Sequence, residues 1–184
     1  MNNNNLHTIR DEAVELLKQL IATPSFSKEE DKTAEILFHF LSQRTTHVKQ
    51  VGNNVWARNV RYDESKPTIL LNSHHDTVKP NKGYTIDPFA AMSDNGKLFG
   101  LGSNDAGGSL VSLIATFLYF NERDNLKYNL VLAASAEEEI SGKNGIELVL
   151  PELGPIDFGI VGEPTQMQMA VAETGLMVVD CTVM

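Results

Sequence analysis

The sequence has almost no cysteine, no long apolar run and no excess of positive charge. Its single cysteine, Cys181, has no partner for an internal disulfide bond, which excludes a disulfide-stapled secreted scaffold. The most apolar segment, residues 110–120, is too short to span a bilayer and contains Ser112 and Thr116. Residues 1–7 lack the apolar core of a secretion signal. These absences predict a cytoplasmic protein with no membrane partner.

The charge balance narrows the choice of partners further. Lysine and arginine number 15 against 24 aspartates and glutamates, which gives a net charge of −9. A surface of this sign repels the phosphate groups of nucleic acids and anionic lipids. The length of 184 residues and the 42% hydrophobic content are those of about one ordinary globular domain. A small-molecule ligand is therefore favoured over nucleic acid.

Apolar spacing predicts helices that alternate with short strands. A helix over residues 13–21 is stopped by Pro24, and a capping box at Ser27–Glu30 opens the next helix, which carries its apolar face at residues 36–41. Further helices are expected near residues 110–120 and 145–150. Strands are expected at residues 48–60 as a hairpin, and at 68–72, 129–134, 156–161, 169–173 and 177–183. This order predicts an α/β fold, with a mixed, partly parallel sheet flanked by helices.

Polar clusters follow the ends of several predicted strands. The clusters are His74-His75-Asp76, Asn104-Asp105, Glu137-Glu138-Glu139 and Glu163. Because the carboxyl ends of parallel strands meet at one edge of an open α/β sheet, we expect these side chains to converge. So many carboxylates in one pocket would repel one another unless a divalent cation compensated them. One imidazole with carboxylates and no thiolate suits zinc, with cobalt or manganese as alternatives.

Spacing within two clusters suggests roles. Along an extended backbone His74 and Asp76 project to the same side, so Asp76 can accept from the far ring nitrogen of His74, while His75 points away. In the glutamate triplet, one residue can be a ligand and another the base that takes a proton from a metal-activated water. The alternative for the triplet is a solvated helix start, where acids are favoured by the helix dipole.

Five motifs together resemble one enzyme family. The motifs occupy residues 73–78 (SHHDTV), 87–89 (DPF), 96–105 (GKLFGLGSND), 136–139 (AEEE) and 161–165 (VGEPT). They resemble the dizinc family of acetylornithine deacetylase, succinyl-diaminopimelate desuccinylase, aminoacylase and glutamate carboxypeptidase, in the family's order. They cover about the first half of a family member.

The resemblance implies a role for each site residue. It assigns four metal ligands: His74 and Glu163 to one zinc, Glu139 to the other, and Asp105 to both. It makes Glu138 the general base and has Asp76 orient His74. It also implies a non-proline cis peptide between Asp105 and Ala106. A further ligand, a histidine, is expected beyond Met184, so the chain by itself supplies ligands for one site and only Asp105 and Glu139 for the other.

The resemblance also implies domains and an activity. Residues 1–172 would form the N-terminal part of a zinc-peptidase-like catalytic domain, and residues 173–184 the first strands of a truncated α+β lid domain that forms a homodimer. The implied reaction is hydrolysis of the amide bond of an N-acyl amino acid, such as N-acetyl- or N-succinyl-ornithine, with two zinc ions per complete enzyme and a place in arginine biosynthesis. The alternatives are a dipeptidase or carboxypeptidase of the same family, or a non-catalytic metal-binding homologue.

Overall fold

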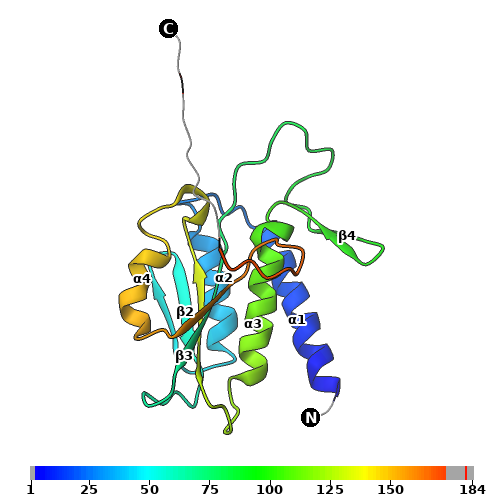
Figure 1. The fold of residues 1–184 in the computed structure, drawn as a ribbon. Coiled ribbons are helices and arrows are strands. Elements are labelled where there is room, and N and C mark those ends of the chain that lie inside the picture. The colour runs from blue at the N-terminus through cyan, green and yellow to red at the C-terminus, as the bar shows by residue number, and fades with distance from the viewer. Residues whose placement is uncertain (1–2, 173–180, 182–184) are drawn as a thin grey trace.

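The computed structural model describes residues 3–172 and residue 181. A five-stranded sheet lies between α1, α2 and α3 on one face and α4 on the other (Figure 1). The helices are α1 (Asn3–Ala22), α2 (Asp31–Ser42), α3 (Gly108–Phe120) and α4 (Ile146–Leu153), with the π-helical turn η1 (Ser103–Gly107) and the 3-10 turn η2 (Glu138–Ile140). The strands are β1 (Val48–Val51), β2 (Asn54–Arg58), β3 (Thr68–His74), β4 (Met92–Asp94), β5 (Lys97–Phe99), β6 (Asn129–Ser135) and β7 (Phe158–Val161).

The order of strands in the sheet is β1-β2-β6-β3-β7. β3 pairs in parallel with β6 on one side and with β7 on the other, whereas β2 is antiparallel to β6 and β1 is antiparallel to β2. The predicted mixed, partly parallel sheet flanked by helices is therefore confirmed. β6 and β7 both follow β3 in the sequence but pair on its opposite sides. The carboxyl ends of these three parallel strands therefore meet where successive connections lead to opposite sides of β3, which is the position where α/β proteins bind ligands.

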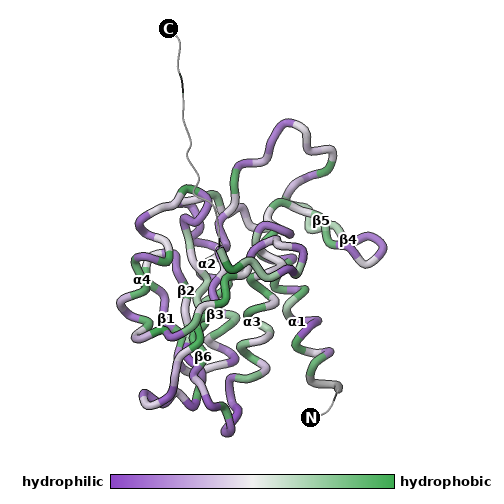
Figure 2. The backbone as a smooth tube through the Cα atoms, viewed as in Figure 1, coloured by the Kyte–Doolittle hydropathy of each residue, from purple (hydrophilic) through white to green (hydrophobic). Residues whose placement is uncertain are grey.

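Side chains that alternate along the strands build two cores. On β2, Val55 and Ala57 face the larger core beneath α1, α2 and α3, whereas Trp56 faces the smaller core beneath α4. β6 alternates in the same way, with Leu132 on the first side and Val131 on the second. Figure 2 shows this apolar interior along the central strands. Because both faces are covered, the central strands carry almost continuous apolar runs instead of alternating with polar residues.

The N-terminal helices differ in detail from their predictions. α1 begins at Asn3, ahead of the predicted start, because residues 6–8 are exposed and build no apolar face that spacing could detect. α2 begins at Asp31, and the predicted capping box is wrong. Ser27 Oγ donates to Asp76 Oδ2 at 2.7 Å instead of capping the helix, and Glu30 Oε1 accepts from Lys28 N at 2.7 Å. The Ser27 hydroxyl is therefore bound to the buried carboxylate of Asp76, which is distant in sequence.

Two further elements depart from the sequence pattern. α4 continues through Pro151 to Leu153, where it was expected to end at Pro151, because Val149 and Leu153 both pack into the smaller core. Residues 169–172 form no strand, and Met169 and Val171 are each 86% exposed with no neighbouring strand among the described residues. The strand predicted at residues 177–183 lies outside the described residues apart from residue 181, so the lid-domain boundary stays a prediction.

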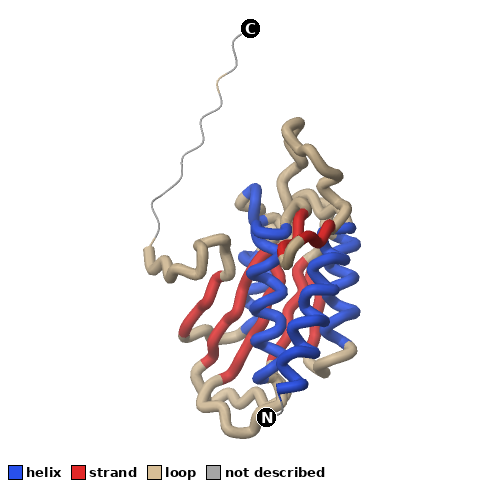
Figure 3. Tube along the Cα trace, turned by 90° about the vertical axis from the view of Figure 1, so that its right-hand side faces the viewer, coloured by secondary structure: helices blue, strands red, loops and turns tan. Residues whose placement is uncertain are grey.

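Within residues 3–172, no helix has both the length and the apolar composition needed to cross a bilayer. Figure 3 shows the helices lying against the strands, with the loops gathered at the two ends of the sheet. The loops at the carboxyl edge of β3, β6 and β7 carry the predicted polar clusters. The architecture therefore brings the clusters to one edge, as the sequence predicted.

Candidate metal centre

Each predicted site residue sits just after a strand or just before a helix at this edge. His74 is the last residue of β3, and Asp76 follows it by two residues. Asp105 lies in η1, immediately before α3. The glutamates Glu138 and Glu139 form the start of η2 after β6, and Glu163 lies two residues beyond β7.

His74 stands at the centre of the carboxylates. Its Nε2 atom lies 3.2 Å from Asp105 Oδ1, and 3.8 Å from both Glu138 Oε2 and Glu163 Oε2. One ligand atom from each of His74, Asp105 and Glu139 falls within 4.8 Å of the others. Zinc ligands lie about 2.0–2.2 Å from the ion, so ligand atoms this close together can serve one cation or a pair of neighbouring cations that share Asp105. The fit of the donor set to a divalent cation is therefore good.

Asp76 contacts both His74 and the Glu138–Glu139 segment from the buried side of the cluster. The residue is 1% exposed, and its Oδ1 lies 3.3 Å from His74 Nδ1. It also accepts from Glu138 N at 3.0 Å and from Glu139 N at 3.2 Å, and from the hydroxyl of Ser27. His74 Nδ1 donates toward Asp76, whose carbonyl lies at 3.0 Å, so Nε2 is the ring nitrogen turned toward the other carboxylates and would bind a metal once its proton is displaced. The sequence pattern missed the contacts of Asp76 with the glutamate segment.

The pKa values show how strongly these groups interact. Burial by itself lowers the pKa of His74, but the hydrogen bond to Asp76 and the charges of Asp76, Glu163 and Glu138 raise it to about 9. Burial raises the pKa of Glu163 to about 7, and the neighbouring carboxylates add to the rise while His74 opposes it. In the same way, burial and then Asp105 raise the pKa of Glu139. A cation at this position would relieve the excess of negative charge.

Asp76 differs from the other acids of the cluster. Burial pushes its pKa up, yet hydrogen bonds from His74, Ser27 and the two backbone N–H groups of the glutamate segment lower it overall. The lowered pKa favours the ionised form of Asp76 in the folded protein. This supports its predicted role in orienting His74.

The segment that presents Asp105 has an unusual backbone. The peptide between Asp105 and Ala106 is cis, as the resemblance implied. Gly102, which precedes η1, has φ +74°, and a Cβ there would lie 2.6 Å from Thr77 Cγ2, so only glycine fits without strain. The Asp105 side chain is 56% exposed, so its carboxylate is open to solvent.

Glu137 has a structural role that the sequence did not reveal. Its side chain is buried and accepts from Asn144 Nδ2 at 2.9 Å, and its carbonyl accepts from Gly142 N at 2.8 Å. The interpretation of the triplet as a solvated helix start is therefore wrong for this residue. Glu137 instead closes the loop behind Glu138 and Glu139.

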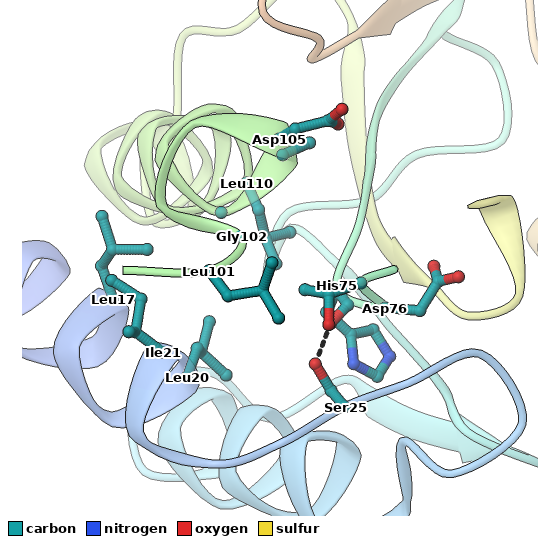
Figure 4. A pocket seen from close by; sticks show the side chains of 13 residues that line it. Leu17, Leu20, Ile21, Ser25, His75, Asp76, Leu101, Gly102, Asp105 and Leu110 are labelled. Atoms are coloured by element: carbon teal, nitrogen blue, oxygen red, sulfur yellow. Dashed lines mark hydrogen bonds between the residues drawn. The ribbon is translucent and has the colours of Figure 1, made fainter. Parts of the chain in front are cut away.

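A small pocket lies under the cluster, between α1 and the loops that carry Asp76 and Asp105 (Figure 4). The side chains of Leu17, Leu20 and Ile21 form its apolar wall. His75 points away from the metal ligands, as predicted, and its Nε2 donates to the carbonyl of Asn53 at 2.8 Å. Apolar side chains therefore line the buried side of the cluster. On its other side, Asp105, Glu138 and Glu163 are at least partly exposed to solvent.

The structure thus combines an α/β fold with a cluster of one histidine and several carboxylates, at the carboxyl edge of the sheet, that could hold a metal ion. The family model for Peptidase family M20/M25/M40 matches residues 70–179, which is more than half of the chain. The chain belongs to this family. The resemblance seen in the motifs is thereby confirmed.

Three relatives illustrate the likeness. The succinyl-diaminopimelate desuccinylase of Buchnera aphidicola is 34% identical over 161 residues, covering 82% of this chain and 42% of the relative. The acetylornithine deacetylase of Proteus mirabilis is 30% identical over 174 residues, covering 88% and 45%. The structure of the M20 family metallo-carboxypeptidase Sso-CP2 from Sulfolobus solfataricus matches with a TM-score of 0.64 and 25% identity, covering 88% and 37%. The chain thus spans less than half the length of each relative.

Proposed function

We propose that the protein carrying this sequence hydrolyses the amide bond of an N-acyl amino acid, with N-acetyl- or N-succinyl-ornithine as the favoured substrate type. The observation that carries the proposal is the convergence of His74 Nε2 with the carboxylates of Asp105, Glu138 and Glu163 within 3.2–3.8 Å. The names of the deacetylase and desuccinylase relatives support amide hydrolysis of this kind.

The donor set favours zinc, two ions per complete enzyme, with cobalt or manganese as substitutes. We assign His74 and Glu163 to one ion, Glu139 to the other and Asp105 to both. When bound, the metal ions supply an acidified water and a polarised amide carbonyl. Asp76 keeps His74 in the tautomer that leaves Nε2 free for the metal.

Glu138 is the proposed general base. Its side chain is 52% exposed and lies beside the ligands, so its carboxylate faces the space open to substrate. It takes the proton from the attacking water and delivers it to the departing amine. Its backbone N–H donates to Asp76, which fixes the backbone position from which the Glu138 side chain extends.

A substrate panel tests this proposal. We expect the purified full-length protein, loaded with zinc or cobalt, to release free amino acid from N-acetylornithine or N-succinylornithine, and to lose this activity in a chelator and regain it on metal addition. The measurement is amine release at equal concentrations of acyl-amino acids and dipeptides. Turnover that survives exhaustive chelation would contradict the proposal.

The second candidate is a dipeptidase or carboxypeptidase of the same chemistry, favoured by the likeness to the metallo-carboxypeptidase. Faster cleavage of dipeptides than of acyl-amino acids in the same panel would select it. Metal binding without turnover on either set would select a non-catalytic metal-binding protein.

Further proposals concern the whole protein. We infer a cytoplasmic location, a role in amino-acid biosynthesis such as that of arginine, and a homodimer formed through a lid domain that starts near residue 173. Residues 1–172 would then be the N-terminal part of the catalytic domain. The acidic net charge of −9 supports a small-molecule substrate over nucleic acid or membrane partners.

A further inference from the structure

A second polar cluster lies buried behind the metal centre. Glu30 is 0% exposed and His75 is 6% exposed, and neither belongs to the proposed ligand set. They are joined through Asn53, in the turn between β1 and β2. We call Glu30, Asn53 and His75 the buried network. Ionisable groups so deep in a fold are retained only where hydrogen bonds compensate their burial.

Glu30 is fully engaged as an acceptor. Its Oε1 accepts from Lys28 N at 2.7 Å and from Glu137 N at 3.1 Å. Its Oε2 accepts from Asn53 Nδ2 at 2.8 Å. The carboxylate thus ties the start of α2 to the hairpin turn and to the residue immediately before Glu138.

The network continues to the loop after β3. The carbonyl of Asn53 accepts from His75 Nε2 at 2.8 Å, and His75 is the chain neighbour of both His74 and Asp76. Thr33 Oγ1 lies 2.9 Å from His75 Nδ1 and donates to the Glu30 carbonyl at 3.0 Å. Hydrogen bonds therefore run without a break from the loop of His74 to the loop of Glu138.

The glutamate segment needs such support. Glu137 has φ +52°, in the left-handed region that non-glycine residues rarely adopt. Asp76 holds the N–H groups of Glu138 and Glu139 from one side, and Glu30 holds the N–H of Glu137 from the other. Without an acceptor at Glu30, the Glu137 N–H would be buried and unpaired, and the segment would relax toward an ordinary backbone conformation.

We propose that Glu30 is a positioning residue for the proposed hydrolysis: through Glu137 N and Asn53, it sets the position of Glu138 and Glu139 relative to His74. The catalytic part of this inference rests on the proposed function. The structural part stands on the hydrogen bonds alone, so the two are tested by separate readouts.

The test changes the two hydrogen-bonding partners in the full-length protein. Glu30→Leu removes the acceptor of Glu137 N. Glu30→Gln keeps an oxygen for Lys28 N and Glu137 N, and the Asn53 amide can turn so that its Oδ1 accepts from the introduced amide. Asn53→Asp places a second carboxylate against Glu30, and in the double variant Glu30→Gln/Asn53→Asp the introduced amide donates to the introduced carboxylate, so the network is rebuilt. Glu29→Leu makes the same change as Glu30→Leu on an exposed neighbouring side chain and is the matched control.

The first readout is amide hydrogen exchange, which needs neither metal nor activity. We expect exchange of the Glu137–Glu139 amides to rise by about tenfold or more in Glu30→Leu and in Asn53→Asp, and to stay within about threefold of the parent in Glu30→Gln and in the double variant. Exchange in α3 should not change. Unchanged exchange of the segment in Glu30→Leu, or no recovery in the double variant, would overturn the inference.

The second readout is catalysis. We expect Glu30→Leu and Asn53→Asp each to lower kcat by about 10–100-fold with KM within about threefold, as for residues that orient a catalytic group. Glu30→Gln and the double variant should keep most of the kcat of the parent, and Glu29→Leu should match the parent. Faster exchange with unchanged kcat would overturn the positioning role. A parent protein that hydrolyses nothing in the panel would overturn the proposed function, while the exchange data would still decide whether the network holds the segment.

Discussion

Replacing Glu138 with alanine is expected to lower kcat of the full-length protein by about 10²–10⁴-fold, with the metal content unchanged. Glu138 Oε2 lies 3.8 Å from His74 Nε2, the same distance as the proposed ligand Glu163. The family's motif, in which the base precedes a ligand, assigns Glu138 to move a proton and not to hold an ion. Loss of the carboxylate removes the base and leaves the binding site.

Kinetics and elemental analysis on the same samples check this expectation. Glu139→Ala is the contrasting variant, because its carboxylate is a proposed ligand and its loss should deplete metal as well as activity. Glu147→Ala, an exposed position on α4, is the control and should match the parent in both. Near-normal turnover in Glu138→Ala would move the role of the base to another residue.

The second large effect concerns stabilisation by metal. Adding zinc at about 100 times its dissociation constant should stabilise the parent protein by about 2.7 kcal/mol, which raises Tm by roughly 5–10 °C at this size. His74→Ala removes the one nitrogen ligand that the described residues supply to the cluster. We expect the variant to lose most of this rise and at least about 100-fold in metal affinity, since even an orienting partner of a ligand is worth 10–100-fold.

The comparison is made within each variant, with and without metal, by calorimetry and chelator competition. His74 is 1% exposed, so His74→Ala also lowers the stability of the metal-free protein, and the change in Tm on metal addition separates the two effects. His47→Ala, at an exposed position, should keep the full rise. An equal rise in His74→Ala would show that the metal binds elsewhere.

The sequence predicted the parts of the site that follow from strand position. His74, Asp105, Glu138 and Glu163 each lie within a few residues of a strand end or a helix start, and the parallel pairing of β3 with β6 and β7 brings them together. Alternation along the strand also predicted that Asp76 faces the ring of His74 and that His75 points away. These features depend on local periodicity and on one topological rule.

The features that were missed depend on contacts between distant segments. Ser27 and Glu30 were expected to cap a helix, but each meets a partner far along the chain, at Asp76 and at Glu137. The buried, left-handed conformation of Glu137 and the hairpin of β4 and β5 also left no clear periodic signal. A polar side chain can hydrogen-bond to local or to distant groups, and the sequence pattern shows only the local ones. Tertiary packing decides which partner is used.

Anomalous diffraction from crystals of the full-length protein grown with zinc or cobalt tests the central claim most directly. The account predicts a peak about 2.0–2.2 Å from His74 Nε2 and from carboxylate oxygens of Asp105 and Glu163, and a second peak bound by Asp105 and Glu139. The account is contradicted if, with metal present in solution, no peak lies within bonding distance of His74 and Asp105, or if the metal binds at a different place on the molecule.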